Sequence, residues 1–209
     1  MSSYSENFEK IKSLVTRNSA NIQVINNTTF WIADEKQSND SCRINILFSS
    51  KHNWLKVAQS QGLECSVLPV DGNEGVFQAS GLPVEDINKF VYQWKTENGI
   101  ESKTPGDCDC LIVTNELHFL EFKAEASSET LQQIDNNRNK GEAQLAKSLT
   151  SIREQLGGFN VKCTCVLVVP DFFSYPKFKA NESRKIRFLK IHKCELKEVS
   201  TSGKTQYSL

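Results

Sequence analysis

The sequence has no excess of charge of either sign and no long apolar stretch. Its 209 residues include 25 Lys or Arg and 25 Asp or Glu, and this balance argues against a surface coated with cations for nonspecific nucleic-acid binding. No run of about 18 apolar residues occurs, so no segment is expected to span a membrane. The first residues lack the basic-then-apolar order of a signal peptide. Together these absences predict a cytoplasmic protein without a membrane partner.

Metal-binding motifs of cysteine and histidine are also lacking. The seven cysteines are an odd number, and free thiols are expected in a cytoplasmic chain. Cys108 and Cys110, with Cys163 and Cys165, could supply four thiolates to zinc, which leaves a zinc-stabilised interaction module as a third alternative. However, zinc motifs usually have two or more residues between cysteines, and small buried thiols pack well at the start of apolar strands. We therefore expect structural thiols.

Length and composition suit an ordinary globular chain. A hydrophobic fraction of 38% and a charged fraction of 24% are typical of a protein with a substantial core. We expect an N-terminal α/β elaboration over residues 1–80, which could belong to the same domain, and a core over 81–209. The patterns predict strands and helices in the first part of the chain as follows: strands at 22–32 and 43–48, and helices at 8–15, 52–61 and 84–94.

A strand, a turn and a returning strand form the most informative stretch. Residues 111–113 are apolar, residues 114–116 are a polar turn, and residues 118–123 form the second strand of a predicted hairpin. Side chains at i and i+2 of a strand point the same way, so Glu121 and Lys123 are expected to project from one face.

The length of the hairpin loop decides whether an acid can join this pair. With a two-residue loop of Asn115 and Glu116, Asp109 would face the wrong side of the sheet. With a three-residue loop, Asp109 lies opposite Glu121 or Lys123. The candidate site therefore requires the longer loop.

Two carboxylates beside an ammonium group suggest a catalytic metal site. Asp109 and Glu121 would repel each other unless a cation lay between them, and their hard oxygens suit Mg²⁺ or Mn²⁺. Such a metal lowers the pKa of bound water and neutralises charge on a phosphodiester. Lys123 could orient the water or stabilise the transition state. Asp107 has the same strand parity as Asp109 and is the competing metal ligand.

The segments Pro105-Gly106-Asp107-Cys108-Asp109 and Glu121-Phe122-Lys123 resemble the PD-(D/E)XK, or restriction-endonuclease-like, nuclease superfamily. The resemblance implies that Asp109 and Glu121 bind a divalent metal and that Lys123 assists hydrolysis. The chain departs from the strict motif because Gly106 follows Pro105. The family fold would be an α/β mixed central sheet flanked by helices.

The order of elements after the hairpin agrees with this resemblance. Helices are predicted at 124–135 and 142–156, separated by turn residues at 136–141, and a buried strand is predicted at 161–169. A helix of this length is what a parallel return strand needs. In some members of the superfamily a Gln on the crossover helix reaches the active site, which implies a catalytic role for Gln144.

Further acids and a basic cluster are candidates for the same function. The resemblance implies another acid from the preceding helix, at Glu85, Glu97 or Glu101, although Glu85 also suits the first turn of that helix. Residues 171–209 hold nine Lys or Arg and four Asp or Glu, interleaved with aromatics. This cluster predicts phosphate binding, and its alternative is a solvated loop with an edge strand at 187–191. The nucleic-acid-binding candidates are Lys177, Lys179, Arg184 and Lys185.

The sequence therefore predicts a Mg²⁺- or Mn²⁺-dependent nuclease, with DNA favoured over RNA as the substrate. Because the net charge is zero, a protein partner could help to hold the nucleic acid, and cutting both strands of a duplex could require two sites, as in a homodimer. The alternative is a non-catalytic protein-binding module, such as an immunity or assembly factor, on a similar scaffold. In that case Glu121 and Lys123 would be an ordinary ion pair.

Overall fold

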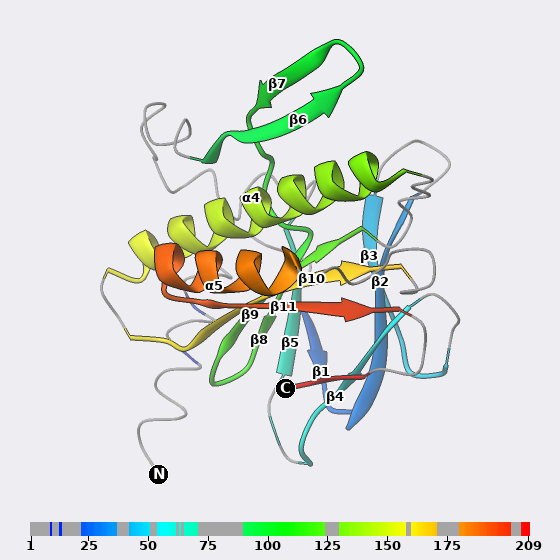
Figure 1. Ribbon diagram of the computed structural model, residues 1–209. Coiled ribbons are helices and arrows are strands. Elements are labelled where there is room, and N and C mark those ends of the chain that lie inside the picture. The colour runs from blue at the N-terminus through cyan, green and yellow to red at the C-terminus, as the bar shows by residue number, and fades with distance from the viewer. Residues whose placement is uncertain are drawn as a thin grey trace.

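The computed structural model describes Glu9, Ser13 and residues 22–36, 42–50, 54–61, 63, 65–70, 90–123, 130–157, 160–170, 180–201 and 206–209. These residues form an α/β protein with a six-stranded mixed sheet, a four-stranded sheet, a two-stranded hairpin and two long helices (Figure 1). Neither of these helices has an apolar stretch long enough to cross a membrane.

The six-stranded sheet carries the predicted hairpin at its centre. Its first four strands in the order β1-β5-β8-β9-β10-β11 pair antiparallel, whereas β10 runs parallel to both β9 and β11. All residues of β10 are buried, as expected for a central strand covered on both faces. The bounds are β1 (Gln23–Ile25), β5 (Cys65–Pro69), β8 (Cys110–Val113), β9 (Leu117–Phe122), β10 (Cys163–Val169) and β11 (Glu195–Ser200).

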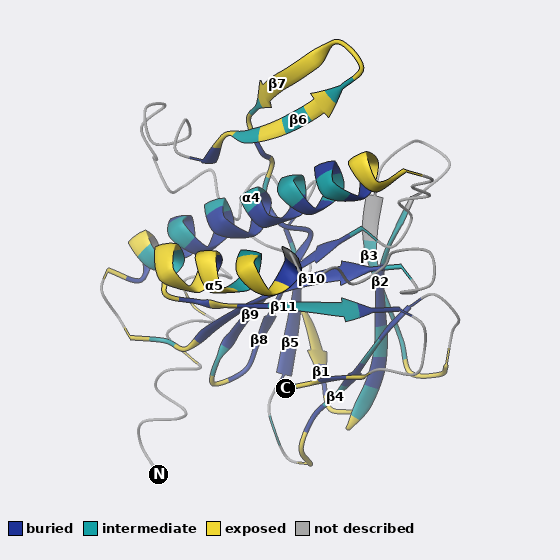
Figure 2. Ribbon diagram, in the orientation of Figure 1, coloured by how far each residue is buried: buried dark blue, intermediate teal, exposed yellow. Residues whose placement is uncertain are grey.

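Two hydrophobic cores lie on opposite faces of this sheet. The helix-side core joins the sheet to helices α4 (Leu131–Gln155) and α5 (Ala180–His192), and contains Phe119, Leu149 and Phe188. The inter-sheet core joins it to the four-stranded sheet through residues such as Phe30 and Leu120. Figure 2 shows the buried strands between these layers. The four-stranded sheet has the order β12 (Gln206–Ser208), β4 (Leu55–Ala58), β2 (Thr29–Lys36) and β3 (Cys42–Leu47).

The prediction of an α/β fold with a mixed sheet is confirmed, but the described helices cover only one face of it. The opposite face is covered by the four-stranded sheet, which residues 29–58 build together with the C-terminal strand β12. Strands β1 and β5, also from the predicted N-terminal elaboration, pair within the main sheet. The described strands before residue 80 therefore share a core with those after it.

Two predictions in the N-terminal part need correction. The expected helix at 52–61 is wrong, because residues 55–58 form β4 with alternate side chains of Leu55 and Val57 buried in the inter-sheet core. The strand expected at 22–32 is divided into β1 and β2. Strands β5 and β11 were not predicted, because β5 is a short segment that ends in proline and β11 has only two apolar residues. Of the opening helix predicted at 8–15, only Glu9 and Ser13 lie within the described residues, and both are helical.

A hairpin of β6 (Tyr92–Thr96) and β7 (Gly99–Lys103) projects above α4 (Figure 1). The helix predicted at 84–94 is therefore wrong for its last residues, and its residues 84–89 lie outside the described part of the chain. The rings of Tyr92 and Trp94 meet edge to face with centroids 6.3 Å apart, as two residues of the same strand face can do. The turn uses Gly99 at φ +130°.

Helix α4 is continuous, so the turn predicted at 136–141 is wrong. Thr130 begins the helix by accepting a hydrogen bond from the amide of Gln133, and Gly157, at φ +59°, follows its end as predicted. The residues with turn chemistry serve tertiary contacts instead. A Cβ at Gly141 would lie 2.5 Å from Leu167 Cδ1 and 3.4 Å from Glu121 Cγ. Glycine therefore allows α4 to approach β9 and β10 closely, despite its low helix propensity.

Helix α5 replaces the strand that alternation suggested at 187–191. Phe188 packs into the helix-side core, whereas Ile186, Leu189 and Ile191 are exposed. The apparent alternation therefore came from one buried and several exposed apolar residues on a helix.

Candidate active site

The β8–β9 register confirms the three-residue loop. Cys110 pairs with Leu120 and Val113 with Leu117, which leaves residues 114–116 in the turn. Within this turn the amide of Thr114 donates to the carbonyl of Glu116 at 2.9 Å. The regular pairing ends at Cys110 and Leu120, so Asp109 and Glu121 are the next residues of the two chain segments.

Asp109 enters the site through a local irregularity at the end of this ladder. Its amide donates to the carbonyl of Leu120, the residue that already pairs with Cys110, as in a β-bulge. Consistent with the bulge, Cys108 packs in the helix-side core and Cys110 in the inter-sheet core. The Asp109 carboxylate accepts a hydrogen bond from the amide of Phe122. The carboxylate thus lies between the ends of the two strands, directly beside the Glu-x-Lys segment.

Glu121 and Lys123 extend from the end of β9 toward α4. The Lys123 ammonium donates to the Glu121 carboxylate, whose side chain is fully buried. Gln144 of α4 accepts from Lys123 Nζ at 3.3 Å and donates to the Asp107 carbonyl at 2.8 Å. The amide of Gln144 therefore bridges the lysine and the segment that carries Asp109.

Asp107, the competing metal ligand, is placed differently. Its carboxylate forms an ion pair with Lys147 of α4 at 3.0 Å and is 28% exposed. Asp109 is only 5% exposed. Asp107 therefore lies at the rim of the site with its own cation, and Asp109 lies inside.

The electrostatics of the site show how closely its charges approach. Burial, with a further contribution from Glu121, raises the pKa of Asp109 well above its ordinary value, although Lys123 and the Phe122 amide act in the opposite direction. Burial lowers the pKa of Lys123, but Glu121 and Asp109 outweigh it, so the pKa of this ammonium is raised. Two carboxylates thus share one ammonium in a largely dry environment, which favours uptake of a proton or another cation.

Asp34, an acid that the sequence patterns did not single out, approaches the site from the four-stranded sheet. Asp34 follows Phe30 and Ile32 on the same face of β2, and both of these residues are buried in the inter-sheet core. Its charge contributes to raising the pKa of Asp109 and of Lys123. In the sequence, Asp34 only continues the alternation of an apolar strand. No local pattern shows that this strand packs near the β8–β9 hairpin.

Other predicted residues lie away from this cluster. Glu97 is exposed in the hairpin turn, and Glu101 is exposed on β7 beside Lys103, at 3.2 Å. Glu85, Lys177 and Lys179 lie outside the described residues.

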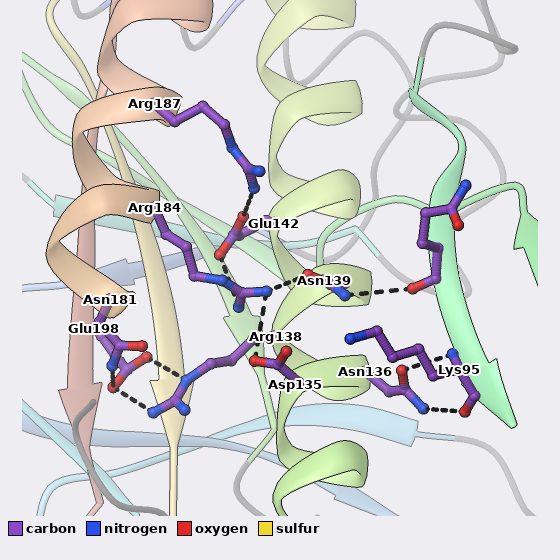
Figure 3. Close-up of polar contacts among 11 residues, drawn as sticks. Lys95, Asp135, Asn136, Arg138, Asn139, Glu142, Asn181, Arg184, Arg187 and Glu198 are labelled. Atoms are coloured by element: carbon purple, nitrogen blue, oxygen red, sulfur yellow. Dashed lines mark hydrogen bonds and ion pairs between the residues drawn. The ribbon is translucent and has the colours of Figure 1, made fainter. Parts of the chain in front are cut away.

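Of the predicted phosphate-binding cations, Arg184 and Lys185 already have acidic partners. Arg184 faces α4, where it donates to Asn139 and pairs with Glu142 at 3.3 Å (Figure 3). Only 14% of its side chain is exposed. Lys185 pairs with Glu182 at 2.9 Å on α5. Arg184 is therefore a contact between helices rather than a free surface cation.

The donors in the site suit a hard cation better than zinc. Asp109 and Glu121 offer carboxylate oxygens, and Mg²⁺ typically takes one or two carboxylates and completes its shell with water or phosphate oxygens. Within the described residues, no three His, Cys, Asp or Glu side chains are grouped closely enough to form a complete metal shell. Cys108 and Cys110 lie in different cores, so these two thiols cannot serve one zinc ion together.

Replacing Asp109 by asparagine is expected to stabilise the metal-free protein at neutral pH. Because the folded-state pKa of Asp109 is raised, the wild type should lose stability as the pH rises from about 4 through that pKa. Asparagine removes this loss and keeps an oxygen for the Phe122 amide. A gain of about 1 kcal/mol would raise the melting temperature by roughly 2–4 °C.

Thermal unfolding in a chelator across a pH series measures this difference. Asp135→Asn, at a site with 47% of its side chain exposed, is the control and should keep the wild-type pH profile. Identical profiles of melting temperature against pH for Asp109→Asn and the wild type would contradict the burial of an ionisable carboxyl at this position.

Fold and site together define an α/β protein with an acidic, lysine-containing cluster where two central strands end. The chain matches no protein-family model, no curated protein and no solved structure. Its chemistry is therefore inferred from its own residues.

Proposed function

We propose that the protein is a metal-dependent nuclease that hydrolyses phosphodiester bonds. The observation that carries this proposal is the convergence of Asp109 with the Glu121–Lys123 pair at the end of the β8–β9 hairpin. With both acids ionised, a buried cluster of two acids and one amine has a net negative charge that a divalent cation would neutralise.

The connections around the cluster support the same proposal. Hairpin β8–β9 is followed by crossover helix α4 and by β10, which returns parallel to β9. This is the order implied by the resemblance to the PD-(D/E)XK superfamily. Gln144 lies on the crossover helix and contacts Lys123, as that resemblance also implies.

Each residue of the cluster would have a separate role in hydrolysis. Asp109 and Glu121 would hold Mg²⁺ or Mn²⁺, which supplies an activated water and neutralises charge on the phosphate. Lys123 can stabilise the negative charge that grows on the phosphoryl oxygens as water attacks. Gln144 holds the ammonium in place through its side-chain oxygen at 3.3 Å. The burial of Glu121 and Asp109 limits solvent around these charges, which strengthens their interactions.

DNA is proposed as the substrate because most proteins with this kind of constellation cut DNA, which is an argument by analogy. We also propose a cytoplasmic location, with a nucleic acid as the partner. Cleavage of both strands of a duplex would be aided by a second copy in a homodimer or by a protein partner.

A cleavage assay tests the proposed function directly. The wild type is incubated with supercoiled plasmid, single-stranded DNA and RNA, each with Mg²⁺, Mn²⁺ or a chelator. We expect DNA cleavage that depends on the metal and is lost in Asp109→Asn, since the substitution removes a metal-binding charge while keeping the shape of the side chain. Folding of the variant is checked by thermal unfolding.

One observation favours the alternative of a non-catalytic binding module. The Lys123 ammonium already neutralises part of the acidic cluster through its direct bond to Glu121, and such a pair can be purely structural. This alternative expects no cleavage of any of the three substrates by the wild type under any metal, and no binding of Mg²⁺ or Mn²⁺ by calorimetry. That pair of results would overturn the nuclease proposal.

A further inference from the structure

The β6–β7 hairpin is attached to α4 through the main chain of one lysine. The amide of Lys95 donates to Asn136 Oδ1 at 2.9 Å, and Asn136 Nδ2 donates to the Lys95 carbonyl at 2.8 Å (Figure 3). Asn136 is only 2% exposed. Asn139 adds a hydrogen bond to the Gln93 carbonyl at 3.3 Å. Side-chain amides thus take the place of a neighbouring strand along β6, and they fix where the Lys95 backbone lies.

The side chain of Lys95 remains exposed although its backbone is held. No acid within the described residues pairs with its ammonium, in contrast to Lys103 on the partner strand, which pairs with Glu101. A two-stranded hairpin has little stability of its own in water. The buried asparagine contact therefore places a solvent-facing cation at a defined point on α4.

A row of residues one helical turn apart leads from this point to the active site. Asn136, Lys140 and Gln144 follow one another at i, i+4 and i+8, so their side chains lie along one side of α4. Lys140 is half-buried, and it too pairs with no acid in the described part of the chain. Gln144 at the end of the row contacts Lys123. The row spans about 12 Å, roughly the rise of three nucleotides in one strand of B-form DNA.

We infer that Lys95 and Lys140 contact the phosphates of a nucleic-acid strand that runs along α4 toward Lys123. This inference rests on the proposed nuclease function and names the surface that would hold its substrate. It assigns substrate binding to the side of α4 that faces the β6–β7 hairpin. On the side that faces α5, Arg184 and Arg187 already pair with Glu142, each at 3.3 Å. Phosphate contacts from two lysines are independent of base sequence, so they would position the strand without selecting a target.

The dependence of DNA binding on salt tests the two contacts. A fluorescent 30-bp duplex is titrated with protein in a chelator, which prevents metal-dependent cleavage, at several salt concentrations. Each lost phosphate contact reduces the slope of log K against log salt by about 0.9. The variant with both Lys95→Ala and Lys140→Ala should therefore lose about 1.8 in slope. Its affinity near 0.1 M salt should fall on the order of 10- to 100-fold.

Two further variants separate charge at this surface from charge in general. Lys162→Ala removes a lysine beside the β8–β9 turn, with 71% of its side chain exposed, and should leave the slope unchanged. Replacing both Lys95 and Lys140 by arginine keeps the charges and should retain the wild-type slope. A wild-type slope in the double alanine variant, or absence of duplex binding by the wild type, overturns the inference. If the double alanine variant keeps the wild-type slope while the wild type cleaves DNA with a metal, the inference fails but the proposed function stands. The two failures are therefore distinguishable.

Discussion

Replacing Lys123 by methionine is expected to lower the rate of metal-dependent DNA cleavage by about 10²–10³-fold, the usual cost of removing one charge-stabilising group from an active site. Methionine keeps most of the apolar stem but cannot donate to Glu121 or Gln144. Rates are measured as single-turnover cleavage of plasmid DNA with Mg²⁺, so that substrate binding does not mask the chemical step.

The stability of this variant must be separated from its activity. Glu121 is fully buried, and loss of its cation is expected to cost about 3–5 kcal/mol. A second variant, Lys123→Met with Glu121→Gln, removes both charges and should regain much of this stability while remaining inactive. A stable but inactive double variant would attribute the loss of activity to chemistry rather than unfolding.

Lys162, which precedes β10 and contacts the turn of the β8–β9 hairpin, provides a matched control. It pairs with Glu116 at 2.8 Å, but 71% of its side chain is exposed. Lys162→Met is expected to change stability by less than about 1 kcal/mol and to leave cleavage unchanged. Cleavage by Lys123→Met at the wild-type rate would contradict a catalytic role for this lysine.

Replacing Arg138 by methionine is expected to destabilise the fold by about 3–5 kcal/mol. Arg138 forms two hydrogen bonds to Glu198 of β11, at 2.9 and 3.0 Å, and only 1% of the arginine side chain and 7% of the glutamate side chain are exposed (Figure 3). The substitution leaves a buried carboxylate with only the amide of Asn181, at 3.3 Å, among the partners shown. Denaturation in urea measures the change.

A double variant distinguishes the ion pair from simple packing. Arg138→Met with Glu198→Leu replaces both charges by apolar groups, and such replacements of buried pairs are often neutral or stabilising. The double variant should therefore be much more stable than Arg138→Met alone. Glu182→Gln, in the exposed pair with Lys185, should change the free energy of unfolding by less than about 1 kcal/mol. A loss under 1 kcal/mol in Arg138→Met would show that this pair does not hold α4 to the sheet.

Several features of the site could be predicted from the sequence because they depend on local geometry. Strand alternation put Glu121 and Lys123 on one face, and the polar residues at 114–116 gave the loop length that brings Asp109 beside the end of β9. The apolar run at 161–169 predicted β10, and the helix that crosses to it had to be long enough for a parallel return.

The continuity of α4 could not be predicted in this way. Asn136 and Gly141 disfavour a helix by their intrinsic preferences, and Arg138 lies between them. Each is explained by a residue that is distant in sequence: Lys95 for Asn136, Glu198 for Arg138 and Leu167 for Gly141. Tertiary contacts outweighed propensity because a few tenths to one kcal/mol per residue is small beside a buried ion pair or a packed interface.

By itself, then, the sequence determined the hairpin, its register and the Glu-x-Lys pair, since periodicity and turn length act over a few residues. The tertiary structure alone decided that Asp34 approaches the site from a second sheet, that Arg184 is neutralised by α4, and that Lys95 is fixed one turn from Lys140. These placements depend on how separate elements pack. Packing is set by the fit of whole faces, which no local pattern encodes.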